Sequence, residues 1–160
     1  MYKIGIDVGS TTAKLVAVDE NDNLLFSKYE RHNAKAKETI LSFLKELLSE
    51  IGDKDISVRI TGSIGMGISE KCSLPFVQEV VAAAKAIQKD YSHVTSMIDI
   101  GGEDAKVVFF NDAEATDLRM NGNCAGGTGA FIDQMAIILG VNIDDLNQLA
   151  MKSTQVYHLA

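Results

Sequence analysis

The sequence predicts an α/β protein made of two copies of a βββαβα unit, the second of them incomplete. Three observations predict this fold class: clustered glycines, a segment that occurs twice, and apolar periodicities that switch between those of strands and helices. Residues 6–16 and 98–108 align at an offset of 92 and are identical at six of eleven positions. Ten of the 13 glycines lie in four clusters, at 9, 62–67, 101–102 and 122–129. An internal duplication therefore organises the chain.

The first copy is predicted to begin with three strands, at about residues 2–8, 13–19 and 23–30. Apolar residues recur at helical spacing from Ile40 to Ile51, so a helix follows and ends near Gly52. A short strand at 56–61, a strand-to-helix turn containing Gly62, Gly65 and Gly67, and a helix at 76–91 complete the copy.

The second copy repeats the three strands, at about residues 95–100, 105–111 and 114–120, and continues with helices at about 128–139 and 143–152. No later strand or helix completes it. The expected lobes are residues 1–93 and an incomplete 94–160, so the chain is expected to be the N-terminal part of a longer protein or an engineered fragment.

Composition narrows the function classes. The chain has 160 residues, 46% of them hydrophobic, and no apolar run long enough to span a membrane, so a soluble domain is expected. Asp7 interrupts the first apolar stretch, which argues against a signal peptide and for a cytoplasmic location. A net charge of −7 argues against nucleic acid as a partner. Two distant cysteines, Cys72 and Cys124, make neither a disulfide framework nor a paired zinc site.

Each copy carries an Asp-x-Gly turn after its first strand. Such a turn presents backbone amides around a concavity that suits an anion. In the first copy the predicted phosphate-binding residues are Gly9, Ser10, Thr11, Thr12 and Lys14, and in the second copy they are Gly101 and Gly102. Asp7 is placed to hold Mg²⁺ directly or through water, and Asp99 is its counterpart. Alternatively, each turn is a plain hairpin turn, and Lys14 and Lys106 only protect the edges of strands.

Cys124 lies in a glycine-rich loop directly before a predicted helix. The positive end of a helix dipole favours a thiolate there, which is one interpretation of this cysteine. An inert structural cysteine is the other. In the same loop, Gly127, Thr128 and Gly129 either present amides to a phosphate at the helix N-terminus or relieve crowding.

Three segments carry a resemblance to a known family: residues 6–11, residues 98–104 and residues 123–131, the last reading Asn-Cys-Ala-Gly-Gly-Thr-Gly-Ala-Phe. Together they resemble the activator ATPases of 2-hydroxyacyl-CoA dehydratases and the related ATPase subunits of benzoyl-CoA reductases. These belong to the superfamily of actin, the heat-shock chaperone ATPases and the sugar and acetate kinases. The resemblance covers the whole chain and implies the actin-like (ribonuclease H-like) fold.

The resemblance also implies cofactors and partners. ATP or ADP with Mg²⁺ would bind between two lobes, with Asp7 and Asp99 positioning metal and water and Glu103 as the candidate base. Cys124 would be one ligand of a 4Fe-4S cluster shared by a homodimer, and hydrolysis would drive one electron from a ferredoxin or flavodoxin to a dehydratase or reductase component. The second ligand would follow residues 152–154, beyond residue 160, and Cys72 does not match it. Many activators have Gln where this chain has Glu103.

Two other functions stay open. A sugar or carboxylate kinase of the same superfamily would use Asp104 as a base and would not need Cys124. A nucleotide-binding module that lacks part of its site would bind ATP without activity.

Overall fold

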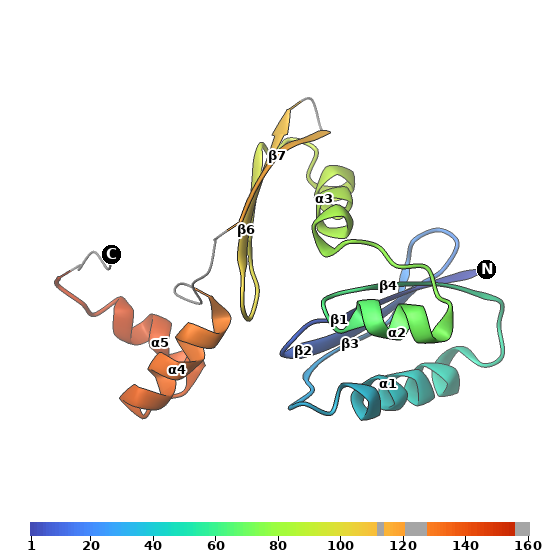
Figure 1. The fold of residues 1–160 in the computed structure, drawn as a ribbon, viewed down its shortest axis with the longest axis horizontal. Helices are drawn as coiled ribbons and strands as arrows, with labels where there is room; N and C mark the ends of the chain where they lie inside the picture. Colours follow the sequence, from blue (N-terminus) through green and yellow to red (C-terminus); the bar gives the residue numbers. More distant parts are fainter. Residues whose placement is uncertain (112–113, 121–127, 156–160) are drawn as a thin grey trace. The chain divides into compact units, whose positions relative to one another are not determined.

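The protein is described by a computed structural model that covers residues 1–111, 114–120 and 128–155. The chain divides into two compact units (Figure 1). The first comprises Met1–Thr95 and Asn111–Glu114, and the second comprises Ser96–Phe110 and Ala115–Ala160. Within the described residues, no helix is long and apolar enough to cross a membrane.

The first unit is built on a four-stranded sheet with the strand order β3-β2-β1-β4. Its strands are β1 (Tyr2–Val8), β2 (Thr12–Val18), β3 (Leu24–Arg31) and β4 (Ile56–Thr61). The neighbours β1 and β2, and β2 and β3, are antiparallel because short turns join them. The strand β4 pairs with β1 in parallel, which requires a crossover, and helix α1 (Ala36–Ile51) supplies it.

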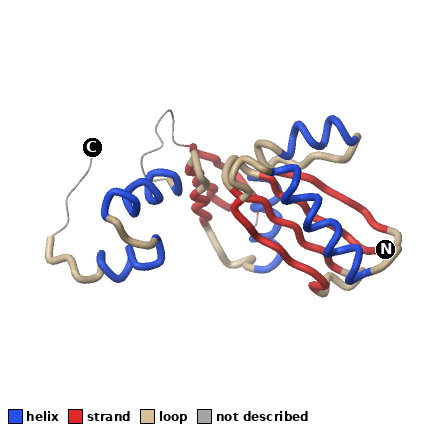
Figure 2. The backbone as a smooth tube through the Cα atoms, turned by 90° about the horizontal axis from the view of Figure 1, so that it is seen from below, coloured by secondary structure: helices blue, strands red, loops and turns tan. Residues whose placement is uncertain are grey.

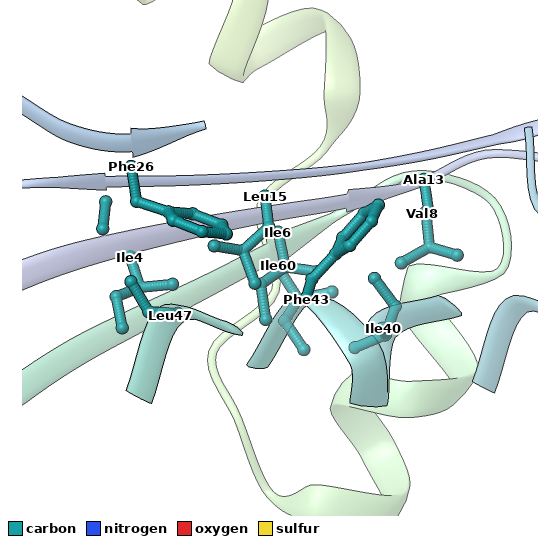
Figure 3. Packing of buried hydrophobic residues seen from close by; sticks show 11 residues of the cluster. Ile4, Ile6, Val8, Ala13, Leu15, Phe26, Ile40, Phe43, Leu47 and Ile60 are labelled. Carbon is teal, nitrogen blue, oxygen red and sulfur yellow. The ribbon is translucent and has the colours of Figure 1, made fainter. Parts of the chain in front are cut away.

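The core lies between one face of this sheet and α1, which runs along it (Figure 1). Alternate residues of β1 and β2 point into the core because successive side chains of a strand face opposite sides. Phe43 of α1 and Leu15 of β2 are completely buried there (Figure 3). Asp7 alternates with the buried Ile6 and Val8, so its side chain lies on the other face of the sheet.

The helices after β4 differ from the single helix expected at 76–91. The structure has α2 (Gly65–Cys72) and α3 (Glu79–Asp90), so the first unit reads βββαβαα. Phe76 lies beside Ile60 in an extended bridge, where the Ile60 N–H donates to Pro75 O over 3.0 Å and the Val77 N–H donates to Ile60 O over 2.8 Å. This pairing along β4 keeps residues 75–77 extended and delays the helix until Glu79.

The second unit contains β5 (Ser96–Ile100), β6 (Ala105–Asn111) and β7 (Glu114–Met120), in the order β5-β6-β7. Helices α4 (Gly129–Leu139) and α5 (Ile143–Ala150) follow and contact each other. Both units therefore start with three strands before their next helix. Figure 2 shows the strands in red and the helices in blue. The bounds expected for these strands and for α4 differ from the observed ones by one residue at most, and α5 ends at Ala150 rather than at Lys152.

Candidate functional site

The turn between β1 and β2 carries Gly9, Ser10 and Thr11, which are predicted to bind phosphate. The Gly9 N–H donates to the Thr12 carbonyl over 3.0 Å and closes the turn. Within the described part of the chain, the amides of Ser10 and Thr11 have no hydrogen-bond acceptor. All four residues are half-buried. Amides left without a protein partner on a tight turn are the donors that an anion requires.

Asp7 and Lys14 are direct cross-strand partners on β1 and β2. The Lys14 Nζ lies 2.6 Å from the Asp7 Oδ2, and the two side chains are 41% and 20% exposed. Partial burial lowers the pKa of Lys14, but the hydrogen bond to Asp7 and the charge of its carboxylate outweigh burial, so the net pKa is raised. Lys14 therefore stays charged beside the turn, and its ammonium is fixed by Asp7.

The second carboxylate oxygen of Asp7, Oδ1, is buried and has no hydrogen-bond partner among the described atoms. The Thr61 hydroxyl is also buried and has no partner in the part of the chain that the structure describes. Thr61 is the register partner of Asp7 on the parallel strand β4. An unpartnered buried carboxylate oxygen is costly, and a bound cation or its water satisfies such an oxygen. These residues fit the predicted Mg²⁺ site, with Asp7 as its carboxylate.

The glycine cluster at 62–67 lies beside the end of β1, where Gly62 approaches Asp7 and Val8 closely. Gly62 has φ +91°, and a Cβ built on it would lie 2.4 Å from the Val8 carbonyl oxygen and 2.6 Å from the Asp7 Oδ1. The Ile64 N–H donates to the Val8 carbonyl over 2.9 Å. Only glycine allows this approach, so Gly62 makes the predicted turn. Gly65 and Gly67, in contrast, lie within α2.

His32, for which the sequence suggests no role, contacts the backbone of the turn between β1 and β2. Its side chain is buried, its backbone N–H donates to the Thr11 carbonyl over 3.2 Å, and its ring Nε2 lies 3.0 Å from the Gly9 carbonyl oxygen. Sequence reasoning missed it because both partners are backbone carbonyls about twenty residues earlier in the chain, and no residue pattern marks such a contact.

The second unit repeats the turn with one change. Asp99 and Lys106 are again cross-strand partners, and the Gly101 N–H donates to the Asp104 carbonyl over 2.8 Å. The Lys106 Nζ, however, lies 3.9 Å from Asp99 and 3.1 Å from Asp104. The Lys106 side chain is almost completely buried, whereas Asp99 is partly exposed. Asp99 is thus held less tightly by its lysine than Asp7 is.

The start of α4 docks on this second turn. The Gly129 N–H donates to the Gly101 carbonyl over 2.8 Å, and the Ala130 N–H donates to the Gly102 carbonyl over 3.0 Å. Thr128, just before α4, is fully buried. Because the Gly129 amide is already occupied, a phosphate contact through it stays a prediction that this geometry does not support.

The remaining predicted residues are not brought together in the described structure. Cys124 and Gly127 lie outside the described residues. Glu103 is exposed, and Cys72 is an exposed free cysteine at the end of α2. In the described ranges, no three His, Cys, Asp or Glu side chains form a group that could hold a metal ion. The Asp7 position offers one carboxylate for a cation, not a complete metal cage.

Comparisons with known proteins identify the relatives of this chain. The profile described as the BadF/BadG/BcrA/BcrD ATPase family matches residues 4–159. The (R)-2-hydroxyglutaryl-CoA dehydratase activating ATPase of Acidaminococcus fermentans is 30% identical over 157 residues, which are 97% of this chain and 60% of that protein. The 2-hydroxyisocaproyl-CoA dehydratase activator of Clostridioides difficile is 31% identical over 166 residues, covering 96% of this chain and 58% of that one.

Solved structures of similar proteins have the same fold. The crystal structure of component A of the Acidaminococcus fermentans dehydratase superposes with a TM-score of 0.84 at 30% identity and covers 98% of this chain and 61% of its own. The Clostridium difficile activator with bound ADPNP gives a TM-score of 0.83 at 29% identity, with 98% and 59% covered. This chain spans about three fifths of the length of these relatives.

Proposed function

The chain belongs to the BadF/BadG/BcrA/BcrD ATPase family and has the actin-like ATPase fold, and we propose that it binds and hydrolyses ATP as part of the activator of a 2-hydroxyacyl-CoA dehydratase or related reductase. The observation that carries the proposal is the pair of matched turns, at Gly9–Thr12 and Gly101–Asp104. Each follows a strand whose penultimate residue is an Asp paired with a cross-strand Lys. The ADPNP bound to the Clostridium difficile activator supports a nucleotide as the ligand.

Each residue has a proposed role. The free amides of Ser10 and Thr11 and the ammonium of Lys14 bind phosphate oxygens, and Asp7 holds Mg²⁺ or its water. Bound Mg²⁺ neutralises charge on the phosphates. Asp99 positions the attacking water, because its carboxylate is partly exposed and held loosely by Lys106. Glu103 is the proposed base. Hydrolysis requires little more than such positioning.

The proposal extends to a cluster shared by two subunits, the lobe boundaries, an electron donor and a location. A 4Fe-4S cluster supplies the one-electron carrier, and it would be held by Cys124 and a later cysteine from each of two subunits. This part rests on Cys124 preceding α4 in the sequence and on the dehydratase activators among the relatives. The lobes are proposed as residues 1–93 and 94–160, the donor as a ferredoxin or flavodoxin, and the location as cytoplasmic.

Nucleotide binding tests the ATPase proposal. Calorimetry of the full-length protein with Mg-ADPNP should show binding, and Asp7→Asn should weaken it by about tenfold or more, because the loss of one charged contact costs about 1.5–3 kcal/mol. Asp53→Asn, an exposed carboxylate in the loop before β4, is the matched control and should bind normally. If the unsubstituted protein does not bind Mg-ADPNP, the proposal is wrong.

Iron content tests the cluster separately. Full-length protein prepared without oxygen should contain about two irons per chain, as expected for one 4Fe-4S cluster per dimer. Cys124→Ser should remove the iron, whereas Cys72→Ser should retain it. A Cys124→Ser protein that keeps its iron contradicts the cluster but not the ATPase. ATP hydrolysis without iron, and only with an added sugar or carboxylate, would favour a kinase.

A further inference from the structure

We propose that His32 is a positioning residue for nucleotide binding, which acts by orienting the amides of the Gly9–Thr12 turn toward the phosphates. The inference rests on the proposed ATP binding and names a residue that the proposed site does not include. His32 touches no phosphate-binding side chain in the described contacts. It acts through two backbone carbonyls of the turn.

The geometry of the two contacts is specific. A carbonyl oxygen only accepts, so the proton of the His32 ring lies on Nε2, which donates to Gly9 over 3.0 Å. The His32 backbone N–H donates to the Thr11 carbonyl over 3.2 Å. His32 is only 4% exposed, so solvent has little access to its ring. One residue thus holds two of the three carbonyls from Gly9 to Thr11.

Planarity of the peptide bond turns these contacts into an orientation of the amides. In a trans peptide, the C=O of one residue and the N–H of the next point in opposite directions. With the Gly9 carbonyl held toward His32, the Ser10 N–H points away from it. The Thr11 carbonyl fixes the Thr12 N–H in the same way. The Ser10 and Thr12 amides are therefore oriented before any ligand arrives, which reduces the ordering cost of binding.

In the second unit, the corresponding glycine carbonyl also accepts a hydrogen bond, but the donor comes from a helix. Gly101 is the counterpart of Gly9 in the repeated segment, and its carbonyl also accepts a hydrogen bond from a residue outside the turn. There the donor is the Gly129 N–H at the start of α4, over 2.8 Å. In the first unit, no backbone N–H from the start of a described helix donates to the Gly9 carbonyl, and the His32 ring donates to it instead. This parallel supports a role in the turn rather than incidental packing.

Only one of the two ring nitrogens of His32 makes a contact in the described structure, so another side chain with a donor at the same position can replace histidine. His32 Nδ1 is buried and has no hydrogen-bond partner among the described atoms. The ring therefore serves the turn as a single donor at Nε2. Glutamine carries an amide nitrogen at a comparable reach and can replace this donor, whereas phenylalanine fills the space without one and asparagine is too short.

The experiment compares His32→Gln, His32→Phe and His32→Asn in the full-length protein, with the exposed His93→Phe as the matched control. Mg-ADPNP affinity is measured by calorimetry, the KM for ATP and kcat by steady-state hydrolysis, and folding by thermal unfolding. We expect His32→Gln to bind within about threefold of the unsubstituted protein. His32→Phe and His32→Asn should bind about tenfold more weakly, as one lost hydrogen bond predicts, with KM raised more than kcat is lowered.

The outcomes are distinct. Equal affinity in all three variants, or equal losses in His32→Gln and His32→Asn, overturns the positioning role. If His32→Phe does not fold, the comparison of His32→Gln with His32→Asn still decides. An unsubstituted protein that does not bind Mg-ADPNP contradicts the proposed function itself, whereas normal binding with unaffected variants contradicts only the role of His32.

Discussion

Asp7 and Asp99 occupy equivalent positions in the two turns but are held differently by their lysines. The Lys14 Nζ is 2.6 Å from Asp7, whereas the Lys106 Nζ is 3.9 Å from Asp99 and closer to Asp104. One oxygen of Asp7 contacts the Lys14 ammonium, and the other is buried with no partner among the described atoms. Asp99 lies farther from its lysine than Asp7 does, and its side chain is more exposed to solvent than that of Asp7. The difference favours a metal-binding role for Asp7 and a water-positioning role for Asp99.

Gly62 should tolerate no side chain. Gly62→Ala places a Cβ at 2.4 Å from the Val8 oxygen and at φ +91°, so the free energy of unfolding should fall by about 3 kcal/mol or more. Gly67→Ala is the matched control within α2. Its Cβ meets nothing within 4 Å, and it should stabilise the protein by about 0.5–1 kcal/mol. Urea unfolding measures both, and a Gly62→Ala protein as stable as the parent would contradict the close approach.

At the level of elements, strands were easier to predict than the helices after β4. Alternating apolar residues and the repeated segment marked the strands, because both signals are local. The helix α2 was missed because Gly65 and Gly67 are poor helix formers and suggested a turn. The helix forms although it contains these two glycines, and its residue Ile68 packs against the core of the first unit. The start of α3 was placed too early because the pairing of residues 75–77 with β4 is a tertiary contact.

Three elements meet at Asp22, which lies in the turn between β2 and β3. Lys3 of β1 and Lys89 of α3 lie 2.7 Å and 2.6 Å from its carboxylate. Hydrogen bonds from Lys3 and then from Lys89, together with their charges, lower the pKa of Asp22 from 3.8 to about 2. The lowered pKa means that this contribution to stability is present above about pH 4 and is lost as the pH falls toward about 2.

Asp22→Asn should therefore lower the urea midpoint at neutral pH, and its difference from the parent should shrink between about pH 4 and pH 2. Added salt should reduce the same difference, because the three side chains are exposed. Asp53→Asn serves as the control and should show no such pH dependence. A constant difference between parent and Asp22→Asn across this range would contradict the ion pairs.

In the whole molecule, the cross-strand pairing of Asp7 with Lys14 and of Asp99 with Lys106 was not predicted. The two matched turns were predicted from the sequence, and the structure has a turn closed by a backbone hydrogen bond at each position. The duplication made this possible, because each copy supported the interpretation of the other. His32 and the docking of Gly129 on Gly101 were not predicted. Both depend on which backbone groups the fold brings together, and that information is not carried by residue type.

A nucleotide that binds only the folded protein should stabilise it as a whole. At a concentration about one hundred times Kd, Mg-ADPNP should add about 2.7 kcal/mol and raise the thermal midpoint. If both turns contact the phosphates, then Asp7→Asn and Asp99→Asn should each reduce this increase, and Asp53→Asn should not. An Asp99→Asn protein stabilised as fully as the parent would show that the second turn does not contribute.

The two hydrogen bonds between the second turn and the first residues of α4 also make a mechanical linkage. Since α4 has 11 residues, it is about 16 Å long, and a rotation of roughly 10° at its start displaces its other end by about 3 Å. If α4 moves as a rigid body, a small rotation at the Gly101 carbonyl therefore becomes a displacement of a few ångströms at the Leu139 end of the helix.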